Sequence, residues 1–425
     1  MGKTFIADKE TLDAVHSQTT AILTALMDED VYGFIEHMDV LSPTERIEYI
    51  GINKNFTPLT VTMGGGFSLG DWDKFPLIVN NKPYMVKSSG DVDYELSATD
   101  YTKKKDGTTA SDVANQSYGG GAFSWLQKIY KKEDIVGSDR IVKFSIEPRE
   151  GYEAVGFIDP DDHELEGVWI PMFYGSIDGN SKMLCVSGNQ PCANNQTSAE
   201  KTAIDNFGSR AKFFGGAIVE TLQDLLIMWA KTTNTQAAYG YGNCNGYDAN
   251  DTYKGVKANA VVNGGQFYGT GSSDKTHLNK ILHSIVLGSW QQWMRDPYTL
   301  CINGRVKVSK NYKYALDGSG YTDTGIQYPT AETSGVYPHK YAAVKGFGAV
   351  PVAPYSGSSS LGGCDIFYNK IDITAVALRF GDCTVDLKAG FRALDLDGAA
   401  TTASWHIGAA VLLLPPVGAS PSDAA

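Results

Sequence analysis

The sequence has little positive charge and no long apolar runs. Its 36 Lys and Arg residues stand against 48 Asp and Glu, which gives a formal net charge of −12. Such a chain gains nothing from neutralising phosphate groups, so we expect neither nucleic acid nor anionic membrane surfaces as partners. No run approaches the roughly 18 apolar residues of a membrane span. The opening residues, MGKTFIADKE, also lack the apolar stretch of a secretory signal. We therefore expect no membrane insertion, and synthesis in a cytoplasm.

Paired cysteines and the common catalytic signatures are also absent. None of the six cysteines forms a C-x-x-C pair, and an even count spread over so long a chain does not indicate a disulfide framework. The sequence has no G-x-S-x-G, H-E-x-x-H or P-loop motif. None of its seven histidines falls in a metal or nucleophile pattern. We expect reduced structural thiols, no catalytic residues, no cofactor and no metal.

Three short segments resemble ligand loops only in part. The segment DPDDHE at 159–164 is more typical of a solvated turn than of a metal site, which is the less favoured alternative. The DLDG segment at 395–398 lacks the complete ligand series and the closing Glu of a calcium loop. The glycine-rich GYGNCNG at 240–246 has no strand-to-helix context for phosphate, so we interpret it as a turn.

The first 50 residues favour a helical attachment or assembly segment. Apolar positions recur there at 3-4-3-4 spacing, interrupted once by Thr; they are Leu12, Val15, Thr19, Ile22 and Leu26. A second helix start is expected at Ser42, with Pro43 at the first helical position and Glu45 at the third. The stripe fits a subunit contact or a helix packed on its own domain.

Glycine-rich turns and short β-branched runs dominate from residue 51 onwards. The chain has 46 Gly, and this richness indicates strands with many turns. We expect strands within 59–69, 76–90, 140–148 and 167–177. We expect residues 51–150 to form either a separate docking domain or part of the domain that follows.

Two longer helices are expected between these strands. The segment 217–231 repeats apolar residues on one face, and 277–294 has a broad apolar face; a shorter helix should begin at Thr197, with Glu200 in capping-box spacing. Few helices among many short strands predict the α+β class.

The segment 377–410, ALRFGDCTVDLKAGFRALDLDGAATTASWHIGAA, combines a regular frame with unrelated side chains. Period-2 alternation places Leu394 and Leu396 on one face and Asp395 and Asp397 on the other. Burial of each leucine stabilises the strand by about 1.5–3 kcal/mol. Trp405 is expected in the core, with His406 on the exposed side.

This frame resembles the variable region of proteins diversified by phage and bacterial diversity-generating retroelements. The family pattern A-L-R-x-G, A-G, L-x-L-x-x-A and W-x-I-G is met in order and spacing. The resemblance implies a C-type lectin-like fold of the formylglycine-generating-enzyme type over residues 151–415, with a small antiparallel sheet, two main helices and long irregular loops. The matching scaffold residues are Arg379, Gly381, Gly390, Leu394, Leu396, Trp405 and Gly408.

The resemblance also implies which side chains contact a ligand. The variable positions are Asp382, Thr384, Val385, Lys388, Phe391, Arg392, Asp395, Asp397, Gly398, Thr402 and His406. Two residues depart from the family pattern: Cys383 stands where aromatic residues or Ser are common, and Phe380 stands where Gly is frequent. The paired catalytic cysteines of the formylglycine-generating enzymes have no match here, so no enzyme activity is carried over.

By this resemblance the chain is a phage virion protein that binds a host-cell surface receptor, either protein or glycan. It would be made in the host cytoplasm, would contact other virion proteins and would form a homotrimer. The alternative is a structural head-fibre, capsid-decoration or tail protein that uses the same domain for particle assembly. A third interpretation, an enzyme acting on host glycans, requires a cleft of convergent carboxylates or a metal. The tail at 416–425 is expected to be disordered.

Overall fold

The computed structural model describes residues 30–62, 65–246, 255–262, 265–271, 274–329 and 333–421. The apolar stripe predicted between Leu12 and Leu26 lies outside these residues. Strands make up 33% of the chain and helices 12%. The expected α+β fold with a small antiparallel sheet is therefore wrong, because the protein is mostly β and is built on a large, curled, mixed sheet.

The large sheet has eight strands from the C-terminal half of the chain. Its order is β16 (Thr322–Gln327), β15 (Arg305–Val308), β14 (Trp293–Ile302), β21 (Thr374–Arg379), β22 (Leu394–Leu396), β20 (Phe367–Asn369) and β17 (Thr333–Val336), with β23 (Ile407–Gly408) beside β14. The β20–β22 and β14–β23 pairs are parallel and the others are antiparallel. Short strands joined by long loops build this sheet, so the few helical segments do not set the architecture.

A second sheet joins distant parts of the chain. It runs in the order β13 (Ala211–Phe213), β24 (Val411–Leu413), β10 (Gly167–Pro171), β7 (Gly120–Gln127), β5 (Pro83–Lys87) and β6 (Val92–Glu95). Strand β24, near the end of the sequence, lies between β13 and β10. The segments 51–150 and 151–415 thus share one hydrogen-bonded sheet.

A third sheet of four strands contains residues that were expected to be helical. Its order is β2 (Ile47–Gly51), β1 (Tyr32–His37), β9 (Asp139–Ser145) and β8 (Tyr130–Val136). The helix predicted to begin at Ser42 is a single turn, in which the Arg46 N–H donates to the Ser42 carbonyl at 2.9 Å. The strand that follows at once, IEYIG, pairs with β1 and ends any helix there. Three two-stranded pairs complete the β structure: β3 (Thr60–Val61) with β4 (Phe67–Ser68), β11 (Ser176–Ile177) with β12 (Met183–Leu184), and β18 (Lys340–Val344) with β19 (Gly348–Val352).

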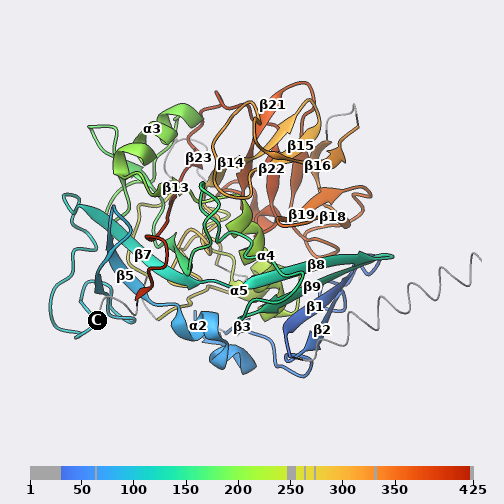
Figure 1. Ribbon diagram of the computed structural model, residues 1–425, viewed down its shortest axis with the longest axis horizontal. Helices are drawn as coiled ribbons and strands as arrows, with labels where there is room; N and C mark the ends of the chain where they lie inside the picture. The colour runs from blue at the N-terminus through green and yellow to red at the C-terminus, as the bar shows by residue number, and fades with distance from the viewer. Residues whose placement is uncertain are drawn as a thin grey trace, which may run out of the picture.

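Four α-helices occur in the described part of the chain. They are α2 (Pro76–Asn80), α3 (Thr197–Phe207), α4 (Ala217–Ala230) and α5 (Thr235–Tyr239). The predicted helix at 217–231 is confirmed as α4, and the one beginning at Thr197 is confirmed as α3. All of α4 is buried, and it lies at the centre of the molecule among the three sheets (Figure 1). The predicted strand at 76–90 is correct only in part, since it begins with α2 before β5.

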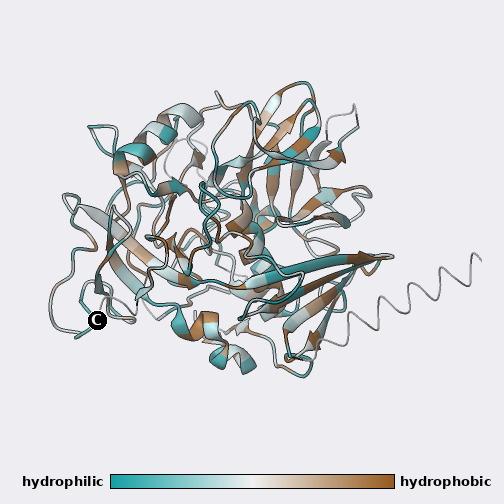
Figure 2. Cartoon of the chain, in the orientation of Figure 1, coloured by the Kyte–Doolittle hydropathy of each residue, from teal (hydrophilic) through white to brown (hydrophobic). Residues whose placement is uncertain are grey.

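The helix predicted at 277–294 is wrong. These residues form turns, and β14 begins within the segment at Trp293. Leu282 and His283 have φ of 51° and 63°, in the left-handed region that interrupts a helix. The broad apolar face reflects burial on all sides in a coiled segment, which hydrophobic periodicity alone does not separate from a helix. Hydrophobic stretches lie on the strands across the middle of the molecule (Figure 2).

Candidate binding site

The segment 377–410 lies in the middle of the largest sheet. Strand β21 pairs with β14 on one side and with β22 on the other, and β23 pairs with β14 further along. The predicted scaffold residues Arg379, Leu394 and Leu396 are buried. The frame inferred from the sequence is therefore the internal support of this region.

Arg379 fixes β21 to the central helix. Its guanidinium donates to the Asp296 carboxylate on β14 at 2.9 Å, to the Thr299 hydroxyl at 3.0 Å, and to the Glu220 carboxylate on α4 at 2.7 Å. Charge-assisted bonds of this kind hold a planar guanidinium in one orientation. The A-L-R element of the frame thus has a structural role in this protein.

The scaffold glycines stand where neighbouring atoms leave no space for a side chain. A Cβ on Gly381, whose φ is 91°, would lie 2.8 Å from the Cβ of Ala389. A Cβ on Gly408 would lie 2.6 Å from the Cys192 carbonyl oxygen, and one on Gly390 would overlap the Asp365 carboxylate. Each position therefore requires glycine.

Phe380 has a glycine-like backbone. Its φ is 78°, which is strained for a bulky residue and free of strain for Gly. Its ring is buried, with centroids 6.3 Å from Phe214 and 6.0 Å from Phe391. The residue that departs from the family pattern thus keeps the backbone conformation of the frequent glycine, and aromatic packing offsets the strain.

Five of the eleven predicted contact positions are buried, and the expectation that they face a ligand is wrong for them. Asp382, Phe391, Arg392 and Asp395 have relative exposures of 1%, 0%, 5% and 9%, and Gly398 is also buried. In this conformation none of these side chains presents a surface to a partner.

Arg392 is part of a buried ion pair with the N-terminal sheet. Its guanidinium donates to both carboxylate oxygens of Glu36 on β1, each at 2.8 Å, and lies 4.3 Å from the centroid of the Tyr341 ring. Burial alone would raise the pKa of Glu36, but Arg392 and Arg46 hold it well below its ordinary value. Arg392 therefore joins two distant parts of the chain.

Asp395 shows why strand alternation was not sufficient to predict which side chains are exposed. It points away from Leu394 and Leu396, as predicted, and is paired across the strands with Tyr368. That second face is covered as well, by a small cluster that includes Trp293 and Ile407. Burial, followed by the charge of Asp397, raises the pKa of Asp395 well above its ordinary value.

The six remaining positions define the C-terminal patch: Thr384, Val385, Lys388, Asp397, Thr402 and His406. Thr384 and Lys388 are exposed, and the other four are partly exposed. Val385 packs against the same cluster as Trp293 and Tyr368, whose rings meet edge-on with centroids 6.4 Å apart. The patch thus surrounds a rigid aromatic pair.

Trp405 borders this patch and is half-buried, so its predicted place in the core is wrong. Its ring centroid lies 5.1 Å from that of His406. The Trp293 N–H donates to the His406 carbonyl oxygen at 2.9 Å, which fixes the backbone of this turn on β14. Both rings therefore contribute to the surface at the end of the segment.

Asp382 lies beneath the patch and orders its loop. One carboxylate oxygen accepts hydrogen bonds from the Thr384 N–H at 2.7 Å and the Thr384 hydroxyl at 2.6 Å. The other oxygen lies 3.2 Å from the His406 Nδ1. Burial raises the pKa of Asp382, and the neighbouring His406 opposes this rise. Asp382 is thus a buried connector between two patch residues.

The patch offers no activated nucleophile. Cys383 is fully buried, and burial raises the pKa of its thiol to about 12, so the reactive thiolate is suppressed. The arrangement presents chemically unrelated side chains on a rigid support.

In the described part of the chain, Asp159, Asp161 and His163 form a group that could hold a metal ion. The Asp159 carboxylate accepts the backbone N–H groups of Asp161 and His163, each at 2.9 Å. This is the geometry of the solvated turn that the sequence favoured. The group includes no residue of the C-terminal patch.

Sequence reasoning missed three residues that shape the site. Trp293 was assigned to a helix, although its place in GSWQQWM could have indicated a buried aromatic residue entering a strand. Tyr368 lies in a strand of only three residues, too short for a periodic signal. Glu36, an acidic residue inside the apolar run YGFIEH, was the available signal for a buried ion pair.

No model of a known protein family matches the chain, and no curated protein matches it. Among the described residues, none of the helices has the length and apolar character needed to cross a membrane.

Proposed function

We propose that this chain is a phage virion protein that binds a host-surface receptor through the C-terminal patch. The observation that carries the proposal is the division within residues 377–410. The frame residues are almost all buried and fixed, while six unrelated side chains at the variable positions stay at the surface around them.

The division limits which positions can vary without loss of the fold. Exposed substitutions usually change stability by no more than about 0.5 kcal/mol. Removing one partner of a buried ion pair, such as Arg392, costs about 3–5 kcal/mol. Diversity of binding is therefore expected at the six patch residues and not at the five buried positions.

The glycine-like backbone of Phe380 supports the family resemblance independently. A φ of 78° is what a frequent glycine at this place would adopt. The patch is small and its residues are partly exposed, so each contact should be weak. We propose a homotrimer displayed in several copies on the particle, since multivalent binding raises the total affinity without new contacts.

Reversal of charge in the patch tests the proposal. We expect the combined variant Lys388→Glu, Asp397→Lys and Thr402→Glu to lose binding to host cells, because the surface that faces the receptor changes. Its melting temperature should move by no more than about 2 °C, since all three side chains are at least partly exposed. Binding is measured by cell pull-down with labelled protein, and stability by circular dichroism.

Lys54→Glu is the matched control, because Lys54 is exposed on another part of the surface. This variant should bind cells like the wild type. Unchanged binding by the triple variant would contradict the proposal. Burial of the patch against neighbouring subunits in the intact particle would also contradict receptor binding. It would instead favour a structural protein that uses this domain for particle assembly.

A further inference from the structure

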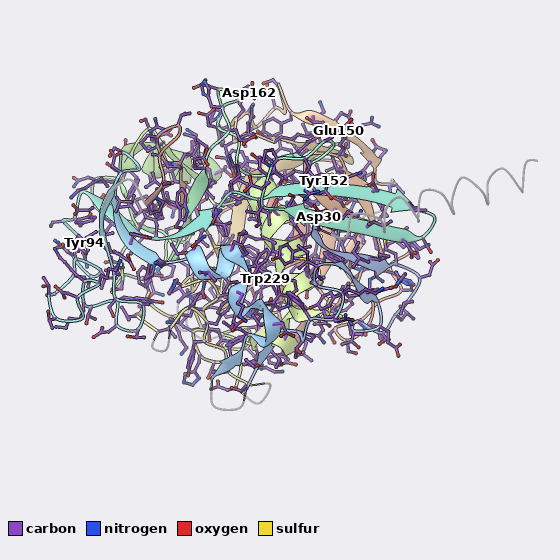
Figure 3. All side chains as sticks on the ribbon, turned by 60° about the horizontal axis from the view of Figure 1, so that its bottom comes forward. Asp30, Tyr94, Glu150, Tyr152, Asp162 and Trp229 are labelled. Atoms are coloured by element: carbon purple, nitrogen blue, oxygen red, sulfur yellow. The ribbon has the colours of Figure 1, made fainter. Side chains whose placement is uncertain are left out.

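A groove of about 800 Å³ lies far along the chain from the patch, over β5, β6 and β7 and the segment that leads into β8. Figure 3 labels one of its lining residues, Tyr94, at the end of the molecule that holds β5 and β6. No residue of the C-terminal patch lines it. Ser420 and Pro421, from the tail, form part of its wall; the disorder predicted for 416–425 stays a prediction.

The floor of the groove comes from one face of the six-stranded sheet. Tyr84 on β5 is paired with Phe123 on β7, so alternate residues put Tyr84 and Trp125 on the same face. Trp169 on β10 is paired with Trp125, and its ring lies 4.7 Å from that of Trp125 and 5.3 Å from that of Tyr84. These tilted and edge-on ring contacts keep the floor rigid.

Two polar atoms of this floor have no partner among the described residues. The Trp169 Nε1 donates to the Gly90 carbonyl at 3.0 Å. The Trp125 Nε1 and the Tyr84 hydroxyl make no such bond within the described ranges, although both residues are more than nine-tenths buried and line the groove. Burial, and then the charge of Glu95, raises the pKa of Tyr84 to about 12, so its hydroxyl remains a donor.

Two lysines of the walls are already paired with carboxylates. Lys105 pairs with Glu95 at 2.7 Å, and Lys128 pairs with Glu164 at 2.7 Å. Three lysines and four carboxylates line the groove, so its charge is nearly balanced. A polyanion such as a nucleic acid would find no excess of positive charge there.

A planar amide pair completes the polar lining. The Asn80 side-chain N–H donates to the Gln127 side-chain oxygen at 2.7 Å. This bond orients the Gln127 amide and leaves its two N–H donors for another group. Gln127 is partly exposed beside Trp125 on the sheet.

We infer that the groove binds an uncharged, hydroxyl-rich ligand, a short oligosaccharide of neutral sugars. Sugar hydroxyls both donate and accept, so they can satisfy the indole and phenol donors, the Gln127 amide and the remaining oxygens of paired carboxylates. The indole and phenol donors face the groove without a partner in the described part of the protein, so they are free to bond a ligand that supplies acceptors. A ligand without acceptors, such as an aliphatic chain, would leave these groups unsatisfied.

The inference goes beyond the receptor binding proposed for the patch, because the groove shares no residue with it. Saturation-transfer NMR of the full chain provides the test. The probes are tetrasaccharides of glucose, mannose, galactose and N-acetylglucosamine, each up to about 10 mM. We expect at least one to bind, and Gln127→Ala to weaken that binding about five-fold, as for one lost hydrogen bond.

Trp125→Phe should weaken binding to a similar extent, since it removes the indole N–H and keeps an aromatic ring. Gln327→Ala is the matched control, because Gln327 is an exposed glutamine on β16 of the eight-stranded sheet. This variant should bind the tetrasaccharide like the wild type. The patch triple variant should also bind normally, which separates failure of this inference from failure of the receptor proposal. The inference is overturned if none of the four probes binds, or if the Gln127 and Gln327 variants bind equally.

Discussion

Lys280 is a buried lysine that no carboxylate neutralises among the described residues. It is 1% exposed, and its Nζ donates to the Val262 carbonyl at 2.6 Å and to the Tyr101 hydroxyl at 3.1 Å. The Tyr101 hydroxyl also lies 2.6 Å from the His283 Nδ1. Burial lowers the pKa of Lys280 to about 7, from an ordinary value of 10.5. The protonation state of Lys280 in the folded chain thus depends on pH near neutrality.

Stability should therefore rise with pH above neutrality. Between pH 7 and 10.5 the unfolded chain keeps the Lys280 proton while the folded chain releases it, so the free energy of unfolding increases with pH. The full rise is at most about 5 kcal/mol. Lys280→Met should flatten this rise. Urea unfolding at pH 7 and at pH 9.5 measures it.

Lys257→Met gives the matched comparison, because Lys257 is exposed. This variant should keep the slope of the wild type. A Lys280→Met protein with the same slope as the wild type would show that Lys280 is charged in the fold throughout this range.

At the scale of elements, α4 and the strands around it are joined by charges in the core. The buried ion network includes Glu36 on β1, Lys131 on β8, Arg140 on β9, Asp224 on α4 and Arg392 before β22. Arg140 donates to both Asp224 oxygens, at 2.8 and 2.7 Å. The Lys131 Nζ lies 2.5 Å from the Asp224 carboxylate. A helix buried on all sides is thus connected to two sheets by ion pairs as well as apolar contacts.

Loss of one cation from this network should strongly destabilise the fold. Arg392→Ala is expected to lower the free energy of unfolding by about 3–5 kcal/mol, because it leaves the Glu36 carboxylate buried without a bidentate partner. Lys388→Ala, four residues earlier and exposed, should change it by no more than about 0.5 kcal/mol. Chemical denaturation of both variants measures the difference. Equal stabilities would mean that Arg392 is not part of a buried pair.

Elements with a regular period were predictable, and coiled apolar segments were not. The segment 217–231 has 3.6-residue periodicity without glycine, and it forms α4. The segment 277–294 has a similar apolar content, but Leu282 and His283 adopt positive φ and the side chains are buried on all sides. Local sequence carries no signal for burial by neighbours that are distant in the chain.

At the scale of the whole molecule, the N-terminal third and the remainder are structurally inseparable. The six-stranded sheet places three strands of the later part, β13, β24 and β10, beside three of the N-terminal third, β7, β5 and β6, and the β7–β10 pair joins the two sets. Glu36 from β1 neutralises Arg392 near the C-terminus. Contacts so distant in sequence make one cooperative unit.

A fragment that begins at residue 151 should therefore fail to fold. It would lack β5 and β7, expose Trp169 and leave Arg392 without Glu36. We expect no cooperative thermal transition by circular dichroism, in contrast to the full chain measured in parallel. A sharp transition in the fragment would show that the shared sheet is not needed for its stability.

The sequence by itself determined the frame of residues 377–410, the helices α3 and α4, and several strands, because periodicity and glycine placement are local properties of the chain. Tertiary structure alone decided which variable positions reach the surface. Asp395 and Arg392 look like surface residues in sequence, yet a second covering cluster buries one and a partner 356 positions away neutralises the other. Burial depends on all neighbours in space, and sequence alternation reports only the direction in which a side chain points.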